Sequence, residues 1–179
     1  MPFTPFHAGL GIAAKALAPA TVSLQAFTLT QITMDIEPGV QMLRGTEPLH
    51  GWTHTFQGAL VVGVGTFALW RLVQGRRIYR WTVPQISSAS LAISVLLGAW
   101  SHVALDAFIH HDMVSSRELL GLAQQAVQPH GFAEALCVGA ALAGVLALAY
   151  RWRREGIKKV WREIADNLAR APRWFTREK

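Results

Sequence analysis

Three apolar segments, each close to the length of a membrane-spanning helix, constrain this chain more than any other feature. They run from His54 to Val73, from Ile86 to Ile109 and from Gly131 to Tyr150. A helix needs about 20 predominantly apolar residues to cross the hydrocarbon core of a bilayer. Charged residues make up only 16% of the chain, against about 25% in a soluble domain. The sequence therefore predicts an all-α integral membrane bundle with three spanning helices.

Two weaker apolar stretches precede these segments. Residues 5–17 follow a threonine and begin with a proline, which is a common way to start a helix, and they end before Pro19. Residues 21–43 are apolar at first but are interrupted by Pro38 and Gly39. Neither stretch is a clear span by itself, and together they predict an N-terminal helical hairpin.

The charge distribution divides the chain into two parts. Residues 1–150 carry seven basic and seven acidic groups, whereas residues 151–179 carry ten basic and four acidic groups. In the second part, Ile157, Trp161 and Ile164 share one face of a predicted helix. We therefore expect a membrane-embedded domain over 1–150 and a basic amphipathic helix in 151–179, lying on the membrane surface or docking on a partner. The basic excess is confined to this tail and accompanies no nucleic-acid-binding motif, so nucleic acid is not an expected partner.

The same charges predict which way the helices cross. Arginines follow the first apolar segment at positions 71, 76, 77 and 80, and a second basic group follows the third segment. The positive-inside rule places both groups, and the C-terminus, in the cytoplasm. Six of the seven histidines then lie at the outer end of the bundle. If the N-terminal hairpin holds, His7, Asp35 and Glu37 join them.

Pairs of ionisable residues spaced four apart suggest what this end of the bundle does. His102 and Asp106 lie one helical turn apart within an apolar segment, where ionisable groups are costly and usually functional. His50 and His54 repeat the spacing at the start of another segment, as do His130 and Glu134. Imidazole and carboxylate groups suit zinc or manganese. The alternative interpretation is a buried hydrogen bond that holds the helices together.

Other candidates complete the predicted site. Asp35 and Glu37 are two residues apart and would not share a helix face unless Pro38 breaks the helix, in which case both could converge. We expect Asp35 to bind metal and Glu37 to act as a general base. His7 follows the first helix start and could point into the same cluster. The sole cysteine, Cys137, lies in an apolar run and excludes a cysteine zinc cluster.

Four of these pieces, in their order and approximate spacing, resemble a known family. They are Pro5-Phe-His7-x-Gly9, Met34-Asp35-Ile-Glu37-Pro38, His50-Gly-Trp-Thr-His54-Thr55 and Gly98-x-x-Ser101-His102-x-x-x-Asp106. The set is similar to bacterial inner-membrane metal-dependent hydrolases of the YdjM type, which are distantly like zinc-dependent phospholipases C. The resemblance covers residues 5–106.

This resemblance implies a location in the bacterial inner membrane, a divalent metal (zinc, or alternatively manganese), and a set of ligands. The implied ligands are His7, Asp35, His50 or His54, His102 and Asp106. The chain departs from the family pattern at two places. The family usually has Asp-x-Asp where this chain has Asp35-Ile-Glu37, and it often has an arginine after the histidine that corresponds to His50, where this chain has Gly51. The missing arginine removes a group that would bind phosphate.

The expected function is metal-dependent hydrolysis of a phosphoester or another lipid-borne bond at the periplasmic face, with a membrane lipid as partner. The segment 115–126 would cover the site as a lid. One alternative is a non-catalytic subunit of a larger membrane protein complex that holds a structural metal. Another is a haem or pigment protein in which His54 and His102 are axial ligands.

Overall fold

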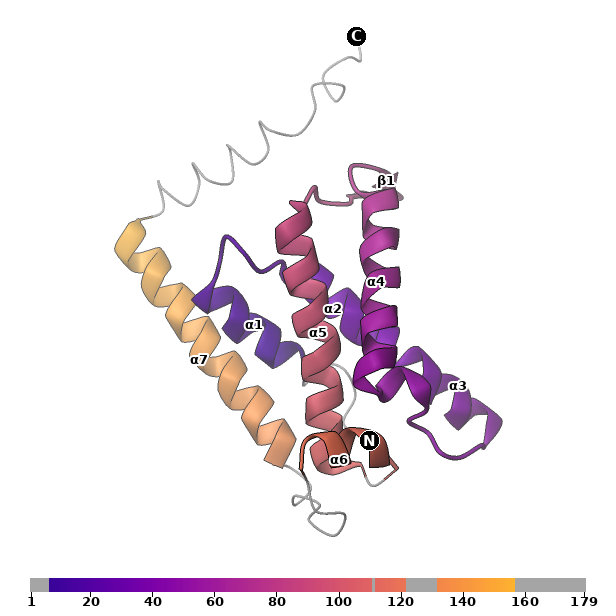
Figure 1. The fold of residues 1–179 in the computed structure, drawn as a ribbon. Coiled ribbons are helices and arrows are strands. Elements are labelled where there is room, and N and C mark those ends of the chain that lie inside the picture. Colours follow the sequence, from indigo (N-terminus) through magenta and orange to yellow (C-terminus); the bar gives the residue numbers. More distant parts are fainter. Residues whose placement is uncertain (1–6, 111, 122–131, 157–179) are drawn as a thin grey trace.

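The computed structural model describes residues 7–110, 112–121 and 132–156 (Figure 1). Three of the described helices are long and apolar enough to cross a membrane, which is consistent with a multi-pass membrane protein. They are α4 (Phe56–Val73), α5 (Ser88–Ile109) and α7 (Phe132–Glu155). Each begins within two residues of the start predicted from the sequence. The predicted C-terminal amphipathic helix lies outside the described residues.

Helix α5 forms the centre of the bundle. Its membrane-length window is 56% buried, compared with 28% for α4 and 11% for α7. Helices α2 (Leu24–Met34) and α4 pack against α5, while α1 (Ala8–Leu17) packs mainly against α7 (Figure 1). The exposed side chains on α4 and α7 are largely apolar, as expected of helices that face lipid.

Helices α1 and α2 are joined by a short turn that contacts α5. Ser23 caps α2 by accepting a hydrogen bond from the Ala26 N–H, and the Ser23 N–H donates to Ser94 Oγ on α5 at 2.7 Å. Each helix is only about 15 Å long, half the thickness of the hydrocarbon core. The pair therefore enters and leaves at the same end of the bundle, which brings the residues on either side of it, His7 and Asp35, together.

A bend separates α2 from α3 (Ile36–Arg44), where the sequence had predicted one interrupted stretch. Asp35 is both the last cap of α2 and the first cap of α3. Pro38 has no N–H to donate to the carbonyl of Met34, so the regular helix ladder is broken across this junction. Gly45, at a φ of 62°, ends α3 in the left-handed conformation that favours glycine. The bend turns the Asp35 side chain towards α5.

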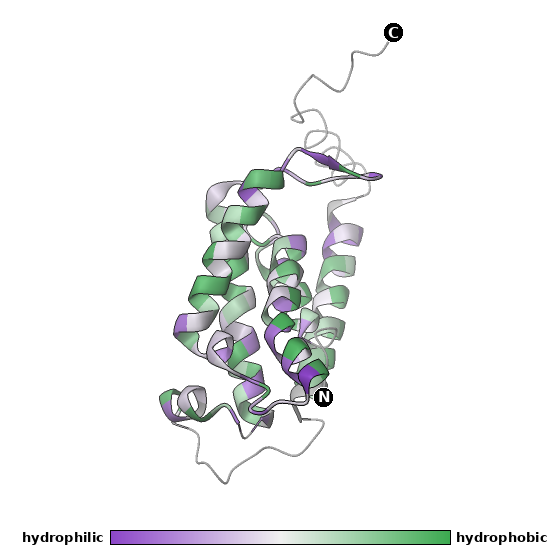
Figure 2. Cartoon of the chain, turned by 90° about the vertical axis from the view of Figure 1, so that its right-hand side faces the viewer, coloured by the Kyte–Doolittle hydropathy of each residue, from purple (hydrophilic) through white to green (hydrophobic). Residues whose placement is uncertain are grey.

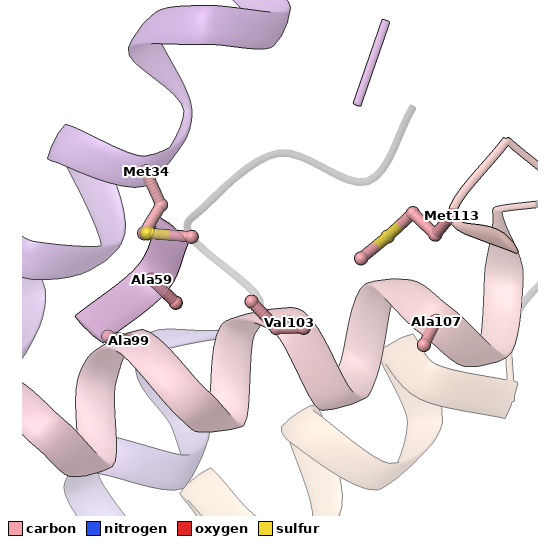
Figure 3. Packing of buried hydrophobic residues seen from close by; sticks show 6 residues of the cluster. All are labelled: Met34, Ala59, Ala99, Val103, Ala107 and Met113. Atoms are coloured by element: carbon pink, nitrogen blue, oxygen red, sulfur yellow. The ribbon is translucent and has the colours of Figure 1, made fainter. Parts of the chain in front are cut away.

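Small side chains allow α2, α4 and α5 to approach closely near the site. Met34 of α2 meets Ala59 of α4 and the α5 residues Ala99 and Val103 in a fully buried cluster that Figure 3 shows. A Cβ on Gly98 would lie 3.0 Å from the carbonyl oxygen of Phe27, an unusually tight contact, so glycine at this position favours the close approach of α2 and α5. Leu, Val or Ile in place of Ala59, Gly98 or Ala99 would push these helices apart near the polar end of the bundle.

The two ends of the bundle differ in chemistry. At one end, α4 and α5 are joined by a two-stranded turn, β1 (Arg77–Ile78) and β2 (Trp81–Thr82), which the all-α prediction did not include. Its hydrophilic character stands out against the long helices in Figure 2. At the other end lie α3, the 3₁₀ turn η1 (Trp52–His54) and α6 (Val114–Leu119). Every histidine in the described part of the chain lies at this second end.

Candidate metal centre

Five ionisable side chains from four parts of the chain converge at the polar end of the bundle, and we call them the inner cluster. His7 precedes α1, Asp35 sits at the α2–α3 bend, His54 ends η1, and His102 and Asp106 share one face of α5. All three histidines and Asp106 are at most 3% exposed, while the Asp35 side chain is 29% exposed. The structure thus brings together five of the six predicted metal ligands.

His102 Nε2 is the centre of this cluster. It lies 3.1 Å from Asp106 Oδ2, 3.2 Å from Asp35 Oδ1 and 3.3 Å from His54 Nε2. His54 Nε2 lies 3.6 Å from the same Asp106 oxygen. Ligands at 2.0–2.1 Å around a tetrahedral zinc are separated by about 3.3–3.4 Å. These four separations are of the size expected between ligands of one small divalent ion, and the ligand atoms of Asp35, His54 and His102 all lie within 4.8 Å of one another.

Gln31 on α2 determines which nitrogen of His102 faces the other ligands. The Gln31 side-chain amide donates to the Gly98 carbonyl at 2.9 Å, which leaves its oxygen directed at His102 Nδ1, 2.5 Å away. Because a carbonyl oxygen only accepts, His102 Nδ1 must carry a proton. A neutral His102 then presents the lone pair of Nε2 to two carboxylate oxygens. That arrangement is repulsive unless a cation, either a proton or a metal ion, lies between them.

Asp106 contributes both of its oxygens. Oδ2 faces His54 and His102, as described, while Oδ1 lies 3.4 Å from His7 Nε2 and 4.0 Å from His110 Nε2. His7, His102 and Asp106 form a second group whose ligand atoms all lie within 4.8 Å of one another. Asp35 differs, because its Oδ2 is buried and has no hydrogen-bond partner among the described residues. A buried carboxylate oxygen without a donor is an expensive arrangement that a bound cation would relieve.

Burial keeps His54 neutral. Desolvation is the main cause that lowers the pKa of His54, which falls to about 3. An imidazole must be neutral to bind a metal, so this environment suits a ligand. On its other side, His54 Nδ1 lies 3.1 Å from Thr53 Oγ1, and Ser116 Oγ of α6 donates to the His54 carbonyl at 2.7 Å. Both contacts hold the ring and the turn in place.

Glu37 lies beside this cluster rather than within it. Its Oε2 accepts hydrogen bonds from the Thr53 N–H, at 3.0 Å, and from the Thr53 hydroxyl, and it is 3.9 Å from His54 Nδ1. The carboxylate therefore ties α3 to η1 and faces the side of His54 opposite to Nε2. Its role as a general base stays a prediction.

His50 belongs to a different group, which we call the outer cluster: His50, His110 and Asp112. His50 Nδ1 lies 3.0 Å from both Asp112 oxygens, and the His50 N–H donates to Asp112 Oδ2 at 3.0 Å. Burial raises the pKa of Asp112, but the backbone and ring hydrogen bonds from His50 outweigh it and the pKa falls below its usual value. The rings of His50 and His110 are 4.1 Å apart between centroids. Ligand atoms of His50, His110 and Asp106 lie within 4.8 Å of one another, so these three residues could also hold an ion. The metal role of His50 stays a prediction.

A cavity of about 200 Å³ opens beside the two clusters. Its lining includes His50 and His54 on one side and Val114 and Ser115 of α6 on the other. Helix α6 therefore forms one wall of the cavity next to His54. It contains the first residues of the segment 115–126 that the sequence predicted as a lid. The remainder of that lid, together with His111 and His130, lies outside the described residues.

Sequence reasoning missed Gln31 and Ser116, although Gln31 left a signal. It is a lone amide in an apolar helix, four residues before Asp35, and it is fully buried. A polar side chain one turn before a candidate ligand, on the same helix face, is a natural second contact for the site. Ser116 gave no comparable signal, because serine is common in short loop helices.

Comparison with known proteins identifies a family but no activity. No curated protein and no solved structure matches the chain. One family model covers residues 1–175, nearly the whole chain. It names no hydrolase, and the YdjM-type resemblance stays a prediction. The chain belongs to the family described as domain of unknown function DUF4184.

Proposed function

We propose that this protein is a membrane-bound, metal-dependent hydrolase whose inner cluster binds a divalent ion. Asp35, His54, His102 and Asp106 would hold the ion, with His7 next to them. The observation that carries the proposal is the environment of His102 Nε2. Its partner nitrogen is protonated towards Gln31, yet Nε2 faces two carboxylate oxygens at 3.1 and 3.2 Å. A divalent cation satisfies all of these groups at once.

The donor set fits such an ion. Two imidazole nitrogens and two carboxylate oxygens are typical ligands for zinc, and manganese accepts them as well. When bound, the ion would lower the pKa of a coordinated water towards ~7 and stabilise negative charge on a substrate oxygen. The residues around it keep His54 neutral, orient His102 and exclude bulk water. Asp35 is the most exposed ligand, so water would reach the ion from its side.

The substrate would come from the lipid phase or its surface. The cavity beside His54 includes Trp52 and Val114, which are 56% and 45% exposed, together with hydroxyl groups. Trp at this position is typical of the membrane–water interface. We therefore propose a phosphoester or similar bond in a lipid head group as the substrate. With arginines at the opposite end, the positive-inside rule supports a site on the outer face of a bacterial inner membrane.

A second candidate is a structural metal site in a non-catalytic subunit of a membrane complex. The observation that favours it is the number of protein ligands. Zinc sites with four protein ligands are usually structural, whereas catalytic sites keep one position for water. If His102 Nε2 and the three atoms around it bind one ion at the same time, no position is left for substrate.

Metal analysis of the purified protein tests the proposal. We expect about one zinc or manganese ion per chain, the number that one tetrahedral site takes, and its loss from His102→Ala. Thr66→Val is the matched control, because Thr66 is a buried polar residue of α4 whose hydroxyl bonds only within its own helix. A correctly folded wild-type protein without metal would overturn the proposal.

Activity separates the two candidates. The hydrolase predicts cleavage of at least one member of a panel of soluble and lipid phosphoesters, abolished by His102→Ala and by chelation. A bound ion with no cleavage of any member favours the structural subunit. Glu37→Gln tests the predicted base separately: a base is required for turnover but not for metal content, so activity would fall while the ion remains.

A further inference from the structure

Helix α3 carries an apolar face that nothing in the described part of the chain covers. Ile32, at the end of α2, and Ile36, Val40 and Leu43 of α3 follow one another at spacings of four, four and three residues. These spacings put them on one side of the bent helix. Their exposed fractions are 52%, 59%, 38% and 86%. Four large apolar side chains in one stripe form a surface that water solvates poorly.

The helix projects from the bundle at the level of the metal centre. Figure 1 shows α3 extending sideways from the foot of α4, at the end where α6 lies. Only Pro38 within α3 is buried. Glu37 lies at the edge of the polar side and binds Thr53 in η1. Thr53 is three residues before Phe56, where the membrane-length window of α4 begins. This hydrogen bond therefore fixes α3 at the boundary of the membrane-spanning region.

We propose that α3 lies in the plane of the membrane, with Ile32, Ile36, Val40 and Leu43 buried in the lipid boundary of the leaflet next to the site. Helix α4 exposes apolar side chains from the same level of the bundle, since Leu60, Val61 and Val64 in its first turns are 42%, 55% and 61% exposed. The helix to which Glu37 and Thr53 attach α3 thus faces lipid directly above this attachment. An amphipathic helix that is anchored at interface depth next to a spanning helix is typical of in-plane membrane helices.

The lipid contact has a consequence for the metal centre. Asp35 is the N-cap residue of α3, and its Oδ1 lies 3.2 Å from His102 Nε2. Because α3 makes few other contacts with the bundle, the membrane holds the helix at the depth at which Asp35 reaches His102. This second step rests on the ion of the proposed function, whereas the lipid contact does not.

Spin labels test the lipid contact directly. In a Cys137→Ala background reconstituted in bilayers, nitroxides are attached at Val40→Cys and Leu43→Cys, with Gln41→Cys as the matched control on the polar side. We expect the labels at 40 and 43 to be relaxed by oxygen and protected from water-soluble chromium oxalate, and the label at 41 to show the reverse. Equal exposure of positions 41 and 43 to chromium oxalate would overturn the proposal. Protection of position 43 from both reagents would also overturn it, because that pattern indicates a covering protein.

Metal affinity tests the coupling. Leu43→Glu should weaken metal binding about tenfold in bilayers, as expected from a coupling near 1.4 kcal/mol, while Gln41→Glu should leave it unchanged. Equal affinities for both variants would overturn the coupling but not the spin-label result. A wild-type protein that binds no metal would contradict the proposed function and, with it, the coupling, but not the lipid contact.

Discussion

The inner and outer clusters contain the same residue types but differ in how many carboxylates meet one imidazole. In the outer cluster, His50 faces one carboxylate, Asp112, and the two form a hydrogen-bonded pair that is complete without a metal. In the inner cluster, His102 Nε2 faces Asp35, Asp106 and a second imidazole. One hydrogen on that nitrogen cannot satisfy three partners. Crowding around a single nitrogen, rather than the number of histidines, is therefore what makes the inner cluster the better candidate for a metal site.

Burial strengthens the difference. The inner side chains of His102 and Asp106 are 0% and 4% exposed, whereas the outer side chains of His110 and Asp112 are 20% and 27% exposed. Among the inner carboxylates, water can solvate part of Asp35, whose side chain is 29% exposed, but not Asp106, so uncompensated charge is much more costly around the His102–Asp106 pair. The predictions below test this contrast in order of expected effect.

Replacing the central ligand should have the largest effect. His102→Ala removes the imidazole that both Asp35 and Asp106 face, and removal of one partner of a buried charge network costs about 3–5 kcal/mol. We expect loss of bound metal together with a large fall in thermal stability in detergent. Metal analysis and a thermal unfolding scan measure both. If the variant loses the metal but keeps its stability, loss of a residue from the inner cluster costs no more stability than loss of one from the outer cluster.

Chelation of the wild type should destabilise it by a similar route. A ligand present at a thousand times its dissociation constant stabilises the folded state by about 4 kcal/mol. Removal of the metal should therefore lower the unfolding temperature of the wild type and leave that of His102→Ala unchanged. If the chelator lowers the unfolding temperature of both proteins equally, it acts at a place other than the inner cluster.

The sequence predicted that the ionisable residues gather at one end of the bundle, but it did not separate His50 from His54. The apolar lengths of α4, α5 and α7 and the convergence of ionisable residues at one end followed from hydropathy and charge alone. The four-residue spacing of His50 and His54, however, suggested a shared ion. In the structure η1 intervenes, and although the two rings are 4.9 Å apart between centroids, their nitrogens address different carboxylates.

Ring direction depends on tertiary contacts that a spacing rule does not contain. His50 is turned by Asp112, which is 62 residues away in the chain, and His102 is turned by Gln31, which is 71 residues away. Helix periodicity reports which residues share a face, but not which nitrogen of a ring points inward. The bend at Asp35 was foreseeable from Pro38, because proline breaks the hydrogen-bond ladder wherever it falls inside a helix.

Gln31 offers an intermediate test of the comparison. Gln31→Leu removes the acceptor that holds the proton on His102 Nδ1, and loss of such an outer contact typically lowers metal affinity about 10–100-fold. Gln31→Glu keeps an acceptor and should retain much of the affinity. Thr30→Val is the control, since Thr30 is equally buried and its hydroxyl bonds to the Ala26 carbonyl of its own helix. Equal affinities in the Leu variant and the control would show that Gln31 does not orient the ligand.

Asp112→Asn should have the smallest effect, because the outer cluster works as a hydrogen-bonded pair. The asparagine oxygen can still accept from the His50 N–H and ring, so we expect a loss of about 1 kcal/mol in stability and no change in metal content. Titration of the metal in parallel with Asp106→Asn provides the contrast: Asp106 joins His54 and His102 in the inner cluster, and its variant should lose the metal. If Asp112→Asn also lost it, His50 would have to serve the ion together with Asp106 and His110, and the two clusters would form one extended centre.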